Sequence, residues 1–131
     1  MGIKDKDDKF ASYLTNFTKN RAVVAAVDTL PADHATLPTI DLSTSQSALA
    51  NTIVLMPHLA GGAGTITIQL WRKCPGFILA GDAWTLVQTT AALADTVEAR
   101  FSNLLAGQYQ LACSVISGGS SWDLYEAHTA G

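Results

Sequence analysis

The chain has 131 residues, of which 48% are hydrophobic and 15% charged, and its net charge is −3 at neutral pH. Typical globular domains carry about 25% charged residues, so this composition excludes a disordered chain and predicts one domain with a sizeable core. The acidic balance argues against non-specific nucleic-acid binding, which needs clusters of lysine and arginine.

The N-terminal segment differs from the rest of the chain. Residues 1–21 hold five basic and three acidic residues, and the remainder holds three basic and eight acidic residues. An apolar stripe with the spacing i, i+3, i+4 and i+7 predicts a short amphipathic helix that ends near Asn20; it consists of Phe10, Tyr13, Leu14 and Phe17. This stripe either packs on its own domain or reaches a neighbouring molecule as an arm.

From residue 22 onward the periodicity changes to that of strands. Short alternating runs are separated by turns rich in Gly, Pro and Ser, and we expect Pro57 to end one of them. About eight strands are predicted, over residues 22–27, 39–42, 52–56, 65–72, 83–89, 95–101, 108–117 and 121–127. This pattern predicts an all-β antiparallel sandwich over residues 22–131, either a jelly roll or immunoglobulin-like.

The alternation also predicts which side chains face the core. In the later strands, we expect these positions to be Trp84, Leu86, Val97, Ala99, Phe101, Tyr109, Leu111, Cys113, Val115, Trp122 and Leu124. The sequence FSNLLAGQYQLACSV then describes a strand, a corner and a returning core strand. Gly107 permits the turn, and Tyr109 buries its ring while its hydroxyl bonds a backbone group near the corner.

No pattern of catalytic or metal-binding residues stands out. The acidic run at residues 5–9 lacks the glycine and glutamate that a calcium loop requires, and residues 60–64 lack the lysine of a phosphate-binding loop. His34, His58 and His128 are far apart in the sequence, and the spacing of Cys74 and Cys113 matches no zinc or redox motif. We therefore expect two free thiols, no cofactor, no metal and no enzymatic activity.

Trp71 is out of phase with its apolar neighbours and shares a face with Thr67 and Gln69. We expect it on the outer face of a sheet, beside Arg72 and Lys73. Three explanations stay open: a loop of the same chain covers it, it anchors a protein interface, or it stacks on a sugar ring. The candidate interface residues are thus Phe10, Tyr13, Phe17, Trp71 and Arg72.

Two stretches resemble known proteins. The corner F-x-x-L-x-A-G-x-Y, residues 101–109, is similar to a turn in the last strands of many β-sandwich domains. The run from residue 65 to 128, which includes TITIQLWRK and AWTLVQTT, resembles small jelly-roll-like virion proteins of tailed phages. Such proteins decorate or cement capsids, or form fibres and tail parts.

This resemblance, the low charge density and the absence of a catalytic pattern favour a structural virion protein. We expect a capsid decoration or cement protein, made in the host cytoplasm, that contacts the major capsid or other virion proteins as a homo-oligomer, with a trimer favoured. The N-terminus lacks the apolar core of a signal peptide and no apolar run is long enough to span a membrane, so no membrane contact is expected. The alternative is a carbohydrate-binding or receptor-binding module.

Overall fold

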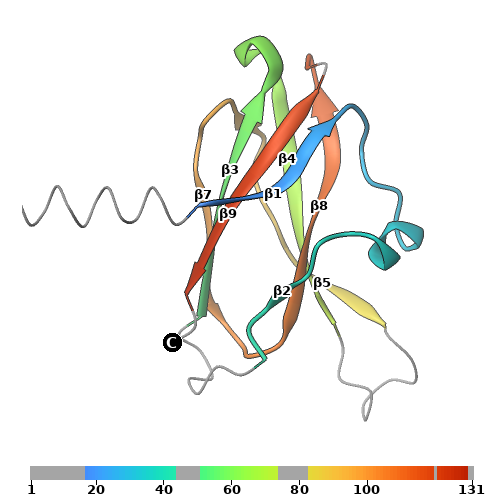
Figure 1. Ribbon diagram of the computed structural model, residues 1–131, viewed down its shortest axis with the longest axis vertical. Helices are drawn as coiled ribbons and strands as arrows, with labels where there is room; N and C mark the ends of the chain where they lie inside the picture. The colour runs from blue at the N-terminus through green and yellow to red at the C-terminus, as the bar shows by residue number, and fades with distance from the viewer. Residues whose placement is uncertain (1–16, 44–50, 74–82, 120, 130–131) are drawn as a thin grey trace, which may run out of the picture.

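The computed structural model describes residues 17–43, 51–73, 83–119 and 121–129, which form two antiparallel sheets packed face to face (Figure 1). Sheet A has the order β1 (Thr18–Val24), β9 (Trp122–Thr129), β3 (Asn51–Leu59), β7 (Ala99–Leu104). Sheet B has the order β2 (Ile40–Asp41), β8 (Gln108–Ser117), β4 (Thr65–Lys73), β5 (Trp84–Thr89), and β6 (Leu93–Ala94) also pairs with β4. Two 3₁₀ turns complete the described elements, η1 (Ala32–Ala35) and η2 (Ala60–Gly62). The predicted all-β sandwich is confirmed.

The connections identify the sandwich as a jelly roll. The chain changes sheet at each step from β1 to β4 and again from β6 to β9, so the strand orders are 1-9-3-7 and 2-8-4-5. An immunoglobulin-like sandwich would instead place its first two strands in the same sheet. β5 and β6 together form one interrupted edge beside β4. Thr90 bridges the interruption, because its N–H donates to the Ile68 carbonyl and its hydroxyl accepts from the Ile68 N–H.

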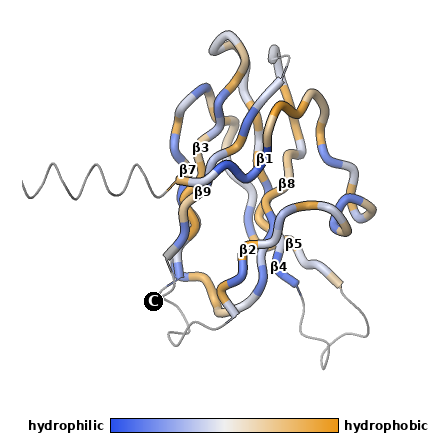
Figure 2. Tube along the Cα trace, in the orientation of Figure 1, coloured by the Kyte–Doolittle hydropathy of each residue, from blue (hydrophilic) through white to orange (hydrophobic). Residues whose placement is uncertain are grey.

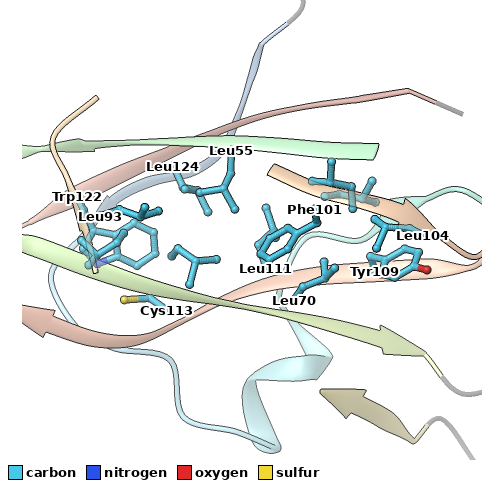
Figure 3. Close-up of a cluster of buried hydrophobic side chains, with 14 of the residues drawn as sticks. Leu55, Leu70, Leu93, Phe101, Leu104, Tyr109, Leu111, Cys113, Trp122 and Leu124 are labelled. Atoms are coloured by element: carbon cyan, nitrogen blue, oxygen red, sulfur yellow. The ribbon is translucent and has the colours of Figure 1, made fainter. Parts of the chain in front are cut away.

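The core lies between the two sheets (Figure 3). Hydrophobic and hydrophilic residues alternate along the strands (Figure 2), as expected where one face of each sheet is buried. In β4, Ile66, Ile68 and Leu70 are completely buried and the residues between them are partly exposed. Each such side chain stabilises the fold by about 1.5–3 kcal/mol relative to an exposed one.

The predicted phase is wrong at four positions. Val115 is about half exposed because a β-bulge shifts the register between β4 and β8, and Ile116 packs against the core in its place. Val97 is exposed because the chain turns there and β7 begins only at Ala99. Trp84 and Leu86 lie outside the core, because a second bulge shifts β5 against β4 and β5 is an edge strand. Trp122 and the other predicted core positions from Phe101 to Leu124 are buried as expected.

Pro57 does not end its strand. β3 continues to Leu59 and pairs with β9 from Thr52 to Leu59, whereas its pairing with β7 stops at Leu55. The backbone groups of Pro57 face the side that β7 has left, so the missing N–H breaks no ladder bond. Its carbonyl accepts the N–H of Thr96 from the segment that leads into β7.

Strand β1 overlaps the end of the predicted N-terminal helix and the predicted domain boundary. Residues 18–20 belong to this strand, so the proposed boundary between residues 21 and 22 falls inside it. Phe10, Tyr13 and Leu14 lie outside the described residues. None of the described segments forms a helix that is long and apolar enough to cross a membrane.

The predicted corner is confirmed at atomic detail. The ring of Tyr109 is buried, and its hydroxyl donates to the Leu105 carbonyl at 2.6 Å. A Cβ at Gly107 would lie 2.8 Å from Nε of Arg72, so a larger residue here would displace the Arg72 side chain. Arg72 Nη2 donates to the Ala106 carbonyl at 2.8 Å, which ties β4 to the corner.

Candidate functional site

The outer face of sheet B is partly covered by the loop between β1 and β2. Asp28 in this loop pairs with Cys113 of β8: its N–H donates to the Cys113 carbonyl, and its carboxylate accepts the Cys113 N–H at 2.7 Å. Arg21 of β1 donates two hydrogen bonds to the same carboxylate, at 2.7 and 2.9 Å. The loop therefore lies beside β8 at Cys113, where a further strand would pair, and it links the two sheets.

Gln110 fixes the second half of this loop. Its side chain is 1% exposed, and its Nε2 donates to the carbonyls of His34 and Leu37. Oε1 of Gln110 lies 2.7 Å from Nδ1 of His34. Because two carbonyls can accept only from the amide nitrogen, Oε1 must be the acceptor and Nδ1 of His34 carries the proton. The 3₁₀ turn η1 is thereby held over β8.

Three aromatic rings meet beside η1. The His34 ring stacks on Trp84 with centroids 5.3 Å apart and an interplanar angle of 12°. It meets Trp71 edge to face, with centroids 5.1 Å apart. Trp71 is oriented further by its Nε1, which donates to Oε1 of Gln69 at 3.2 Å. The three rings come from η1, β4 and β5, and together they form one aromatic cluster on the outer face.

This cluster lines a pocket of about 790 Å³, which we call the outer pocket. Its size falls in the range of about 300–1,000 Å³ that is usual for small-molecule sites. It lies between η1 and β5, two elements that project from the same side of the sandwich (Figure 1). The described lining residues are Leu30, Pro31, His34, Ala35, Leu37, Thr39, Trp71, Lys73, Ala83, Trp84, Gln108 and Gln110, and none of them is acidic.

The predicted interface residues are only partly brought together. Trp71 lies on the outer face as expected, where its own chain covers it in part through His34. Arg72 points to the opposite side of β4, where it pairs across from Tyr109 and supports the corner. Phe17 is partly buried and immediately precedes β1, which belongs to the other sheet. Phe10 and Tyr13 lie outside the described residues.

Trp84 and His34 were missed as site residues. Trp84 was assigned to the core because it alternates with apolar neighbours, a pattern that an edge strand can share with a buried one. His34 lies in a polar loop 76 residues from Gln110, and no local pattern links the two. One feature of the sequence points to Trp84: residues 83–90 carry no charged side chain, which is unusual for an exposed strand.

The remaining candidate groups form structural pairs. His58 Nδ1 lies 3.1 Å from Asp95, whose carboxylate also accepts the Leu59 N–H. His128 Nδ1 lies 3.0 Å from the buried carboxylate of Glu126. Among the described residues, no group of three or more His, Cys, Asp or Glu side chains could hold a metal ion. The two histidine pairs lie on other elements than the outer pocket.

The thiol of Cys113 is free and buried. Burial raises its pKa to about 11, and the nearby negative charge of Asp28 contributes to the rise. A nucleophilic cysteine needs the opposite shift, because the thiolate is the reactive form. Cys113 is therefore a core residue, in agreement with its inward position on β8.

Fold and site together define a jelly-roll sandwich with an aromatic pocket on its outer face. No protein-family model and no curated protein matches the sequence. Among solved structures, the chain is similar to the Yersinia pseudotuberculosis-derived mitogen (YPM), with 9% sequence identity and a TM-score of 0.37. That alignment covers 82% of this chain and 86% of the mitogen.

Proposed function

We propose that the protein is a non-catalytic structural subunit of a phage-like virion, of the decoration or cement type, that acts through protein–protein contacts. The β-sandwich itself is observed, and the virion role is supported by the low charge density and by the surface of β5. Made in the host cytoplasm, the protein would join the particle as a homo-oligomer, with a trimer favoured, and contact the major capsid or another virion protein.

The observation that carries this proposal is the open edge of β5. This strand has six residues and no charge, and every residue after Trp84 is exposed. Leu86 and Val87 are 47% and 44% exposed. An edge strand presents unpaired N–H and C=O groups, and soluble proteins normally protect such edges with charge, Pro or shortness. Although β5 contains a bulge, it has none of these other protections.

The other described edges are protected. β2 has only two residues, one of which is Asp41. β7 carries the exposed side chain of Arg100. β1 carries Lys19 and Arg21 and has two register shifts against β9. Because β5 differs from all three, we assign it as the contact strand and a second copy of this chain as its occupant.

In this mechanism the free energies of several separate contacts add together. A rigid sandwich that touches several neighbours gains stability from many weak contacts, and linked contacts bind far more tightly than single ones. The chain before Thr18 continues from β1, an edge of sheet A, so a segment bearing Phe10 and Tyr13 has its attachment point away from the β5 edge. The arm and the β5 edge would thus serve two different contacts.

The first experiment measures self-association by sedimentation equilibrium. We expect the full chain to be oligomeric at micromolar concentration and the Val87→Lys variant to be monomeric with an unchanged circular-dichroism spectrum. Ser102→Lys places the same charge on the exposed face of β7 and is the matched control. A wild-type chain that is monomeric at 100 times this concentration, or a Val87→Lys variant that still associates, would contradict the proposal.

The second experiment tests the arm on purified particles that have been stripped of this protein. A chain without residues 1–16 keeps every described strand, because β1 begins at Thr18. We expect it to fold and self-associate normally but to rebind the particle poorly. Rebinding equal to that of the full chain would remove the arm from the mechanism.

A second candidate function is carbohydrate binding, as in a receptor-binding fibre or tail component. The outer pocket favours it, because Trp71, Trp84 and His34 present aromatic surface next to the side chains of Gln108 and Thr39. Small-ligand sites commonly combine such aromatic walls with a few polar groups. Retention on immobilised glycans that disappears in Trp71→Ala would support this candidate.

A further inference from the structure

We propose that the outer pocket binds an uncharged sugar residue of a glycan, and that the locked tautomer of His34 selects for hydroxyl groups. The proposal deepens the second candidate function and rests on it. The indole rings of Trp71 and Trp84 would contact the apolar face of the sugar, and His34 and Gln108 would bond its hydroxyls.

The hydrogen bonds of Gln110 hold the His34 ring in one tautomer. Nδ1 donates to Gln110, whose amide orientation is fixed by the carbonyls of His34 and Leu37. In the neutral ring, Nε2 is therefore an acceptor. It makes no hydrogen bond to any residue that the structure describes. The ring thus offers one acceptor at the pocket, which suits an O–H donor and disfavours a carboxylate or a phosphate.

A second polar side chain, that of Gln108, lines the pocket. Gln108 lines the pocket from β8, and its carboxamide makes no hydrogen bond within the described part of the chain. A primary amide both donates and accepts, as a hydroxyl does. Adjacent sugar hydroxyls can therefore satisfy Gln108 and His34 together.

The described lining of the pocket carries little charge. No described lining residue is acidic, and Lys73, which has the only fixed charge among them, already takes part in another interaction. An anionic sugar would thus meet a single lysine among these residues and no cluster of cations. A nucleotide would stack on the same rings, but its phosphate needs a basic groove, which they do not provide.

Two indole rings supply the aromatic surface of the pocket. Trp71 and Trp84 are both partly exposed, and they are fixed by the Gln69 bond and the His34 stack respectively. Rings that are held in place before binding lose little conformational freedom, which favours affinity. The pocket volume of about 790 Å³ leaves room for more than one sugar residue.

The test uses the full chain on an array that carries neutral and acidic oligosaccharides, followed by calorimetric titration of the best neutral and the best acidic oligosaccharide. We expect binding to neutral glycans, an affinity about tenfold lower in Gln108→Leu, and a larger loss in Trp84→Ala. Thr85→Ala changes the opposite side of β5 and is the matched control, with unchanged affinity. Denaturation midpoints verify that each variant is folded.

The possible outcomes distinguish carbohydrate binding as such from the selection for uncharged sugars. Binding to acidic glycans alone, lost in Trp84→Ala, would overturn the selection for uncharged sugars and leave carbohydrate binding standing. No binding to any glycan at millimolar concentration would overturn both. Neutral-glycan binding that survives in Trp84→Ala and Gln108→Leu would place the site elsewhere and overturn the assignment of the outer pocket.

Discussion

Single polar side chains hold the turns of this protein against its sheets. The Tyr109 hydroxyl bonds the Leu105 carbonyl, and the Asn51 amide bonds the Leu104 carbonyl, both at the same end of the sandwich. Each bond gives a backbone carbonyl at the end of β7 a side-chain donor. At this scale the expected effect of a substitution follows from the bond that it removes.

Tyr109→Phe removes one hydroxyl and leaves the buried ring in place. We expect the free energy of unfolding to fall by about 0.5–1.5 kcal/mol, because a single hydrogen bond to the Leu105 carbonyl is lost. Urea denaturation measures the change. Tyr125→Phe is the control, since no hydrogen bond joins the Tyr125 hydroxyl to a described residue, and its effect should stay within about 0.5 kcal/mol.

The thiol of Cys113 gives a prediction at alkaline pH. Its pKa is about 11 in the folded protein, against an ordinary value of 9.0, because burial disfavours the thiolate. This contribution to stability is complete below pH 9 and is lost as the pH rises from 9 to 11. Burial also raises the pKa of Tyr109, which adds a loss above pH 10.

The measurement compares urea denaturation at pH 8 and pH 10.5 in a Cys74→Ser background, so that Cys113 is the sole thiol. We expect the free energy of unfolding to fall over this interval, and to fall less when Cys113→Ala is added. At pH 8 a thiol reagent should label the folded protein only slowly and the unfolded protein fully. Equal alkaline losses with and without Cys113 would contradict this assignment.

At the scale of elements, the 3₁₀ turn η1 depends on sheet B. Its own sequence offers no side-chain cap and no buried residue, so its position comes from the contacts of Gln110 with His34 and Leu37. The inner face of β8 thus packs in the core, and its outer face binds the loop that lines one side of the outer pocket.

Gln110→Leu keeps the volume of the side chain and removes its three hydrogen bonds. We expect a loss of about 2–3 kcal/mol, because buried backbone carbonyls lose their donor. The His34–Trp84 stack should loosen as well, which tryptophan fluorescence detects. Gln88→Leu on exposed β5 is the control and should change stability by less than about 0.5 kcal/mol. A fluorescence spectrum unchanged in Gln110→Leu would show that η1 is held by other contacts.

At the scale of the whole molecule, one carboxylate joins the two sheets. Asp28 accepts two hydrogen bonds from Arg21 of sheet A and one from the Cys113 N–H of sheet B. Its side chain is 4% exposed, and that of Arg21 is 15% exposed. Arg21 also lies over the ring of Trp122 at 5.1 Å, so the same link reaches the core.

Asp28→Ala leaves the Arg21 guanidinium without its partner in a mostly buried place. We expect a loss of about 3–5 kcal/mol in the free energy of unfolding, the usual result of breaking a buried ion pair. The matched control is Lys19→Ala, because its 3.9 Å pair with Asp123 is exposed and worth about 0–1 kcal/mol. If the two substitutions had equal effects, Asp28 would not be the link between the sheets.

Much of this architecture could be predicted from the sequence. Alternation with a period of two is a local property, so it predicted the inward positions of Phe101, Leu111 and Leu124 before any partner strand was known. The corner at Gly107 and Tyr109 was predictable for the same reason, since its hydrogen bond spans only four residues. The outward position of Trp71 followed from its phase alone.

The sites and the exceptions depend on contacts that no local pattern contains. The bulges at Ser114 and Val87 exist only relative to the partner strand β4, so the exposure of Val115, Trp84 and Leu86 could not be predicted from their own strands. The outer pocket needs His34, which Gln110 holds from 76 residues away. The sequence by itself determined an all-β sandwich and its core faces, because strand periodicity is local. Only the tertiary structure decided the jelly-roll order and the outer pocket, because both depend on which distant segments meet.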